Sequence, residues 1–218
     1  MFLEQDGLVY DRGMKGRSAF VLAGGQSRRM GAEKALVELD GRTLLERALS
    51  LARSISGEVQ IVGSKAKFSG YGDVVEDEFP QHGPLGGIHA ALRASTSELN
   101  LMLAVDMPFV EVRFLEFLFV EAARHESAVV TIPRAAGAWQ TLCAVYRKPF
   151  SDLAEQALRA GKNKIDPLFR ETTIQILDEP ALTKLNFSLN MFRNVNTPEE
   201  LEGAARLSER SSETKAVR

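Results

Sequence analysis

Short apolar runs alternate along this chain with longer segments whose apolar residues recur at helical spacing. Runs that predict strands cover residues 19–22, 58–62, 73–77, 99–105, 127–133, 141–146 and 172–177. Helical spacing or a helix start signal predicts helices over residues 43–52, 86–94, 114–123, 149–161 and from 197 onward. Strands that alternate with helices in this way indicate an α/β fold, with a mostly parallel central sheet and helices on both faces.

Local signals support several of these elements. Residues 43–46, Thr-Leu-Leu-Glu, form a capping box, and Pro149 suits the first turn of a helix. At the far end of the chain, Thr197 is followed by proline and two glutamates, which predicts the start of a last helix. The run 99–105 is nearly all apolar, as expected of a central strand that is covered on both faces.

The composition indicates one globular domain in a reducing compartment. With 218 residues, 44% of them hydrophobic, the chain can bury a sizeable core. We expect one domain over residues 18–207, between a flexible N-terminal extension (1–17) and a disordered C-terminal tail (208–218). The net charge of −2 argues against a nucleic-acid partner, and no apolar run reaches the roughly 18 residues of a membrane span. Because Cys143 is the single cysteine and no signal peptide is recognisable, we expect a cytoplasmic protein.

The first predicted strand runs into a loop that is rich in glycine and positive charge. Residues 21–34 read VLAGGQSRRMGAEK and contain Gly24, Gly25, Gly31, Arg28, Arg29 and Lys34. Glycines allow a tight turn with exposed N–H groups, and the cations complement phosphate. The spacing matches neither the ATPase phosphate loop nor the dinucleotide fingerprint. The loop therefore predicts a nucleotide site of another kind, with an ordinary turn and solvated charges as the alternative.

Asp106 is the candidate metal ligand. It lies where the apolar run 99–105 ends, and Pro108 prevents this run from continuing as a central strand. The carboxylate therefore belongs at the carboxyl edge of the sheet, beside the glycine-rich loop. From the residues alone, an aspartate that caps a turn is the alternative.

Three segments together resemble one known family. LAGGQSRRMGAEK at 22–34, HGPLGGIHAAL at 82–92 with LAVDMPFV at 103–110, and NVNTPEEL at 194–201 are similar to motifs of the molybdenum cofactor guanylyltransferases. The resemblance spans roughly residues 18–207 and implies a Rossmann-like nucleotidyltransferase fold. It implies Mg²⁺-dependent transfer of GMP from GTP to molybdenum-bound molybdopterin, with release of pyrophosphate. It also suggests cofactor-biosynthesis proteins and molybdoenzyme chaperones as partners.

The resemblance assigns a nucleotide side to the site. It makes Arg29, Lys34 and Asp106 the catalytic residues, with Asp106 as the ligand of Mg²⁺. The further nucleotide contacts that it implies are Leu22, Ala23, Gly24, Gly25, Ser64 and Asp77. Ser64 stands where the family often has asparagine, and a serine replaces only part of the hydrogen bonding of an amide. For Asp77, a solvated loop carboxylate is the alternative.

The resemblance also assigns an acceptor side. It implies that the molybdopterin contacts are Gly83, Pro84, Gln140, Asn194 and Asn196. In an extended segment Asn194 and Asn196 would point the same way, and the alternative is that they stabilise the turn into the last helix. The family's more usual motif is GPLAG, whereas this chain has glycine at position 86. The rival functions are the related cytidylyltransferase and a noncatalytic nucleotide-binding or cofactor-binding protein.

Overall fold

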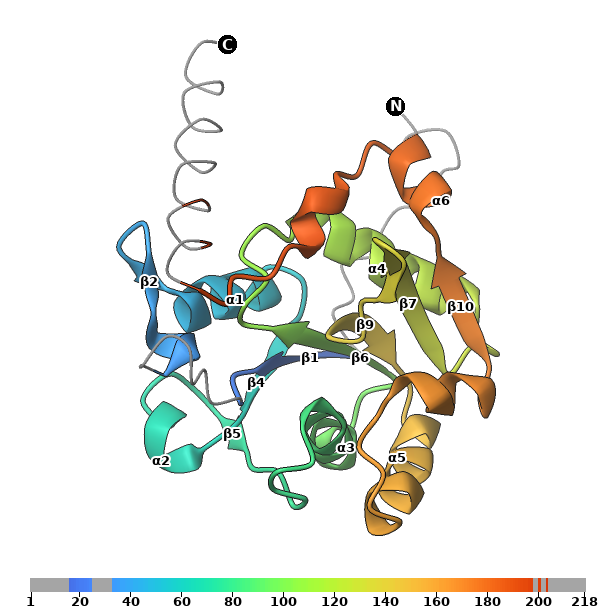
Figure 1. The fold of residues 1–218 in the computed structure, drawn as a ribbon, viewed down its shortest axis with the longest axis horizontal. Helices are drawn as coiled ribbons and strands as arrows, with labels where there is room; N and C mark the ends of the chain where they lie inside the picture. The colour runs from blue at the N-terminus through green and yellow to red at the C-terminus, as the bar shows by residue number, and fades with distance from the viewer. Residues whose placement is uncertain (1–15, 25–32, 198–199, 201–202, 204–218) are drawn as a thin grey trace.

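The fold is a mixed sheet between two layers of helices (Figure 1). The computed structural model describes residues 16–24, 33–197, 200 and 203. The sheet has the strand order β10-β7-β9-β6-β1-β4-β5, with β8 paired to β7. The strands are β1 (Arg17–Leu22), β4 (Glu58–Val62), β5 (Val74–Val75), β6 (Leu99–Ala104), β7 (Val130–Ala135), β8 (Ala138–Trp139), β9 (Cys143–Tyr146) and β10 (Ile174–Leu177). Strands β5, β4, β1 and β6 are parallel neighbours, and β9 runs antiparallel between β6 and β7. The predicted mostly parallel α/β sheet is confirmed.

Alternating side chains of β1 build the two halves of the core. Ala19 and Val21 pack into the cluster beneath α1 (Leu44–Arg53) and α4 (Val112–Arg124). Phe20 and Leu22 point to the opposite face and pack beneath α3 (Pro84–Ala94) and α5 (Pro149–Arg159). Figure 1 shows the two pairs of helices on opposite sides of the sheet. Every residue of β6 is buried, which confirms the central, doubly covered strand.

The structure confirms the main helices that local sequence signals predicted. Thr43 caps α1 through the predicted capping box, in which its hydroxyl accepts from the Glu46 amide and the Glu46 carboxylate accepts from the Thr43 amide. Pro149 is the first residue of α5. Elements that the pattern did not predict are η1 (Lys34–Leu36), β2 (Glu38–Leu39), β3 (Arg42–Thr43), α2 (Lys65–Phe68), β8, η2 (Asp166–Arg170), α6 (Glu179–Lys184) and η3 (Leu189–Phe192). Within the described ranges, no helix is long and apolar enough to cross a membrane.

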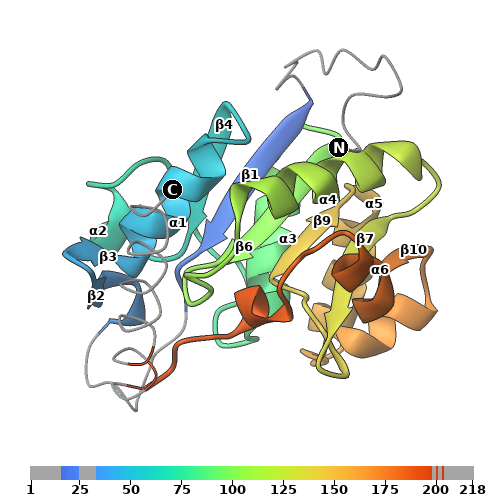
Figure 2. The ribbon, with the colours of Figure 1, turned by 90° about the horizontal axis from the view of Figure 1, so that it is seen from above.

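The segment after β10 returns across α4 to the middle of the sheet. The ring of Phe114 in α4 packs edge-on against Phe187 and Phe192, each with a centroid distance of 5.3 Å. Figure 2 shows this orange-red segment running from α6 towards the side of the molecule where β1 ends. Residues 194–197 follow, and the Val195 amide donates to the Asp106 carbonyl oxygen at 2.9 Å. The expected extension and tail lie outside the described residues, apart from Gly16 and Arg17, of which Arg17 already belongs to β1.

Candidate active site

Four neighbouring strands end at one edge of the sheet, and the predicted site residues follow them. Ala23 comes after β1, Ser64 after β4, Asp77 after β5 and Asp106 after β6. Backbone hydrogen bonds join three of these ends: the Ala23 amide donates to the Val62 carbonyl at 2.9 Å, and the Val105 amide donates to the Leu22 carbonyl at 3.3 Å. Since all four strands are parallel, their carboxyl ends form the edge at which α/β sheets bind ligands.

Lys34 is the centre of a charged cluster at this edge. Its Nζ donates to Asp106 Oδ2 at 2.6 Å and to Asn196 Oδ1 at 2.5 Å. The Lys34 and Asp106 side chains are only 15% and 18% exposed. Asp106 Oδ1 is buried, and no donor among the described residues reaches it. We call Lys34, Asp106 and Asn196 the lysine cluster.

The buried carboxylate oxygen of Asp106 suits a cation. A buried oxygen without a donor is costly unless a ligand satisfies it. The described residues hold no group of three or more acidic, histidine or cysteine side chains that could bind a metal by themselves. An ion at Asp106 would therefore need most of its ligands from water and phosphate oxygens, which is how Mg²⁺ is bound in phosphate-transfer sites.

Asn196, which is predicted to bind the acceptor, contacts Lys34, which is predicted to bind the nucleotide. Its side-chain oxygen contacts Lys34, whereas Asn194 is exposed. The start of the last helix is stabilised by other groups. The Glu200 amide donates to Thr197 Oγ1 at 3.2 Å, and the Thr197 amide donates back to the Glu200 carboxylate at 3.2 Å. The side chain of Asn196 thus belongs to the lysine cluster.

Asp77 and Ser64 lie at the β4–β5 end of the edge. Asp77 Oδ1 accepts from the Phe79 amide at 2.7 Å. Burial raises the pKa of this carboxyl group above its ordinary value, although the hydrogen bond from Phe79 acts in the opposite direction. Ser64 precedes the short helix α2, and its hydroxyl makes no capping bond there. Both side chains are half-buried.

The remaining predicted acceptor residues flank the same edge. Gly83 has a positive φ of 66°, which favours glycine, and Pro84 is the first residue of α3. Gln140 precedes β9, close to the end of β6, because the Ala104 amide donates to the Leu142 carbonyl at 2.9 Å. Gln140 Nε2 donates to the Ala135 carbonyl at 3.3 Å and so supports the β7–β8 turn.

Some predicted residues are not placed. Gly25, Arg28 and Arg29 lie outside the described residues, and their roles stay predictions. Cys143 is fully buried in β9, and burial raises its pKa to about 12. This buried thiol packs in the core and is not an activated nucleophile.

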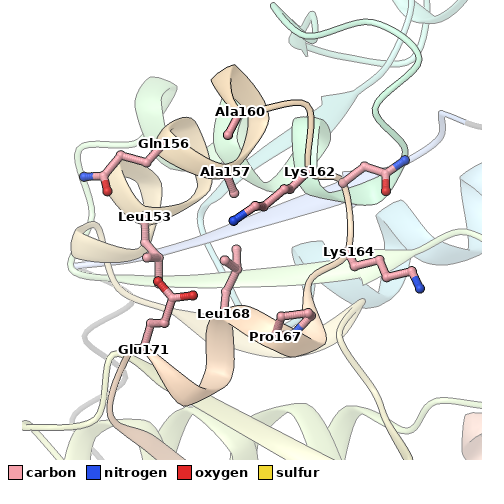
Figure 3. Close-up of a pocket in the computed structure, with 10 residues that line it drawn as sticks. Leu153, Gln156, Ala157, Ala160, Lys162, Lys164, Pro167, Leu168 and Glu171 are labelled. Atoms are coloured by element: carbon pink, nitrogen blue, oxygen red, sulfur yellow. The ribbon is translucent and has the colours of Figure 1, made fainter.

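A separate pocket of about 470 Å³ lies between α5 and the segment 162–171 (Figure 3). It is lined by Leu153, Gln156, Ala157, Ala160, Lys162, Asn163, Lys164, Pro167, Leu168 and Glu171. None of these is a predicted site residue, and Lys162 and Lys164 are exposed at its rim. This pocket therefore lies apart from the predicted site residues at the strand edge.

Known proteins share this sequence and fold. A model of the MobA-like NTP transferase domain matches residues 19–175. A relative from Methanosarcina mazei, named "Probable molybdenum cofactor guanylyltransferase", is 36% identical over 202 residues, which cover 85% of this chain and 88% of that protein. The molybdenum cofactor guanylyltransferase of Desulfosudis oleivorans is 32% identical over 190 residues, with coverage of 86% and 93%.

Solved structures agree with these matches. Molybdopterin-guanine dinucleotide biosynthesis protein A from Archaeoglobus fulgidus superposes with a TM-score of 0.77 at 28% identity, covering 88% of this chain and 99% of that chain. A cytidylyltransferase from Thermus thermophilus that acts on 2-C-methyl-D-erythritol 4-phosphate superposes with a TM-score of 0.62 over 87% and 98% of the two chains. At 16% identity, that likeness concerns the fold alone. By its sequence and its fold, the chain belongs to the MobA-like NTP transferases, the family of the molybdenum cofactor guanylyltransferases.

Proposed function

We propose that this enzyme transfers GMP from GTP to molybdenum-bound molybdopterin and so forms the molybdopterin guanine dinucleotide cofactor. An oxygen of the acceptor phosphate attacks the α-phosphorus of GTP and forms a new phosphorus–oxygen bond. The bond to the leaving group breaks, and pyrophosphate departs with the electron pair. Because the acceptor phosphate is already ionised at neutral pH, this step needs no general base from the protein.

The meeting of Lys34 with Asp106 at the strand edge is the observation that carries the proposal. The step brings two anions together and leaves charge on pyrophosphate, so it needs cations and oriented donors. Lys34 supplies a point charge for the triphosphate, and Arg29 is proposed to bind two phosphate oxygens with its planar guanidinium. Asp106 would hold Mg²⁺ through its buried Oδ1. Mg²⁺, when bound, neutralises charge on the triphosphate and on the departing pyrophosphate.

The other proposed contacts divide between the two substrates. The backbone of residues 22–25, with Ser64 and Asp77, is proposed to bind the base and ribose. The start of α3 at Gly83 and Pro84, with Gln140, Asn194 and Asn196, is proposed to bind molybdopterin. Asn196 would contact the acceptor beside Lys34, at the point where the two substrates must meet. The reaction is proposed to take place in the cytoplasm, with cofactor-biosynthesis proteins and molybdoenzyme chaperones as partners.

Guanine is the proposed base, and cytosine is the alternative. The LAGG and GPLGG segments favour guanine, and the relatives named above carry guanylyltransferase in their names. A pocket that hydrogen-bonds its base leaves buried polar groups unpaired when the wrong base enters, so discrimination should be large. We expect tighter binding of GTP than of CTP or ATP in isothermal titration. Equal or tighter binding of CTP would identify a cytidylyltransferase.

The direct test is pyrophosphate release from GTP with molybdopterin as acceptor and Mg²⁺ present. Asp106→Asn removes the charge that would hold the ion, and we expect the rate to fall by at least ~100-fold. Asp152→Asn, on the exposed side of α5, is the matched control and should leave the rate unchanged. EDTA should abolish turnover of the unmodified protein. Near-normal turnover of Asp106→Asn would remove this carboxylate from the mechanism.

A further inference from the structure

One ammonium group serves the whole lysine cluster. Lys34 Nζ donates to Asp106 Oδ2 at 2.6 Å and to Asn196 Oδ1 at 2.5 Å, so two of its hydrogens are used within the protein. The proposed reaction requires the same ammonium group to bind the triphosphate and the same carboxylate to bind Mg²⁺. Lys34 and Asp106 can therefore pair with each other or with the two parts of the nucleotide complex.

The carboxylate of Asp106 is difficult for an ion to reach while Lys34 holds it. Its Oδ1 is buried without a donor from the described ranges, and its Oδ2 accepts from the Lys34 ammonium group. Only 18% of the Asp106 side chain is exposed. A metal ion at this carboxylate would also be repelled by the ammonium charge, at a place where little water screens the two. The contact with Lys34 therefore weakens the binding of a cation to Asp106.

The backbone of both residues is held in place, whereas the lysine side chain can change partners. The turn that carries Lys34 is closed by a hydrogen bond of 2.9 Å from the Leu36 amide to the Glu33 carbonyl. The main chain of Asp106 accepts from the Val195 amide at 2.9 Å. Since a lysine side chain is a flexible stem, a change of rotamer moves its charge without any change of the fold.

We propose that Lys34 closes the metal site and that the nucleotide opens it. The phosphates draw the ammonium group away from Asp106, and the freed carboxylate then binds Mg²⁺. This inference rests on the proposed function, since it assumes that GTP binds at Lys34. Because coupling between two ligands is reciprocal, Mg²⁺ promotes the transfer of Lys34 to the phosphates by the same factor. One side chain thus makes the binding of metal and nucleotide cooperative.

A static arrangement is the alternative. The third hydrogen of the ammonium group could bind a phosphate while Asp106 keeps Lys34 in place. The carboxylate would then position the lysine for the nucleotide, and its removal should weaken GTP binding even without metal. If Lys34 changes partners, removal of the carboxylate should strengthen metal-free GTP binding, because nothing of opposite charge competes for the lysine. The two arrangements therefore predict effects of opposite sign.

GTP affinity in EDTA, measured by titration calorimetry, determines this sign. Asp106→Asn should bind GTP roughly 5- to 30-fold more tightly than the unmodified protein, as expected for an ion pair of intermediate burial. With excess Mg²⁺ the same variant should bind GTP more weakly. Removal of the carboxylate also removes its repulsion of the phosphates, so the comparison is repeated in the Lys34→Met background. There the gain should be at most about 3-fold, and an equal gain in both backgrounds would overturn the proposal.

Asn196→Ala tests the exchange without a change of charge. It removes the second group that holds the ammonium, so metal-free GTP binding should tighten by roughly 2- to 10-fold, the usual contribution of one hydrogen bond. Asn163→Ala, which is exposed at the separate pocket, is the matched control and should leave GTP affinity unchanged. This comparison needs no Lys34 variant, so it remains decisive even if Lys34→Met folds poorly.

Mn²⁺ binding without nucleotide, read by electron paramagnetic resonance, provides a second measurement. Mn²⁺ takes the same oxygen ligands as Mg²⁺. Lys34→Met should bind Mn²⁺ about 10-fold more tightly than the unmodified protein, because the repelling charge is gone. Lys184→Met, at an exposed lysine of α6, removes the same charge elsewhere and should have no such effect.

The possible failures of the two proposals can be told apart. If either Asp106→Asn or Asn196→Ala weakens metal-free GTP binding, Lys34 is held statically and the exchange is wrong, while the proposed function stands. Mn²⁺ binding that is equal in Lys34→Met and the unmodified protein also overturns the exchange. If the unmodified protein binds GTP neither with Mg²⁺ nor without it, the proposed function fails, and the exchange fails with it.

Discussion

The contact between Lys34 and Asp106 should matter for stability as well as for catalysis. Replacement of Lys34 by methionine keeps most of the side-chain volume and removes the charge. Asp106 Oδ1 already has no partner among the described residues. In this variant Asp106 Oδ2 would also lose its hydrogen bond from the Lys34 ammonium group. Asp106→Asn is the milder change, because Lys34 keeps its contact with Asn196 and its long side chain can extend towards water.

The burial of the pair sets the size of the effect. Exposed ion pairs contribute about 0–1 kcal/mol, whereas removal of one partner from a fully buried pair costs about 3–5 kcal/mol. With 15% and 18% of their side chains exposed, Lys34 and Asp106 lie between these limits, closer to the buried one. We expect Lys34→Met to lower the free energy of unfolding by about 2–3 kcal/mol and Asp106→Asn by about 1 kcal/mol. The double variant should lose less than the sum of the two, with a coupling of about 1–2 kcal/mol.

Urea unfolding at pH 7 in EDTA, followed by circular dichroism, measures these free energies. Arg159 and Glu155 on α5 provide a matched control, since their N–O distance is also 2.6 Å but Arg159 is 69% exposed. The cycle with Arg159→Met and Glu155→Gln should give a coupling of at most about 0.5 kcal/mol. If the two cycles gave equal couplings, distance alone would determine the strength of the pair, and the argument from burial would be wrong.

Two further outcomes are expected. Phe114→Ala should lower the free energy of unfolding by about 3–5 kcal/mol, because this fully buried ring holds Phe187 and Phe192 against α4; a loss below about 1 kcal/mol in urea unfolding would contradict this packing. Asp77→Asn should be at least as stable as the unmodified protein at pH 7. Because the pKa of Asp77 is raised by folding, the folded state binds this proton more tightly than the unfolded state does. The unmodified protein therefore loses stability as the pH rises above about 4, and the asparagine variant does not. Thermal melting of both proteins between pH 4 and pH 8 checks this. If the melting temperature of Asp77→Asn fell progressively below that of the unmodified protein as the pH rises, the predicted pH dependence would be wrong.

Elements with strong local signals were predictable from the sequence. The capping box at Thr43 and the apolar run of β6 are decided by a few adjacent residues, and the structure confirms both. The β2–β3 hairpin was missed although its turn, Asp40-Gly41, has positive φ angles of 53° and 71°. An Asp-Gly pair is a known hairpin signal, so the sequence contained the information, but strands of two residues are too short for a periodic pattern.

The candidate site was only partly predictable. Asp106 could be placed, because the ends of parallel strands meet at one edge whatever the details of packing. The contact between Lys34 and Asn196 depends on the course of the segment after β10, which the packing of Phe187 and Phe192 on α4 determines.

The lysine cluster is also assembled from distant parts of the chain. Lys34 is 72 positions from Asp106 and 162 positions from Asn196. During synthesis the first strands and helices of the sheet leave the ribosome well before the segment that carries Asn196. Contacts at such separations form late, because they require the closure of long loops. A nascent chain can therefore build much of its sheet while it still lacks Asn196, and the complete site arises only when the last segment crosses α4.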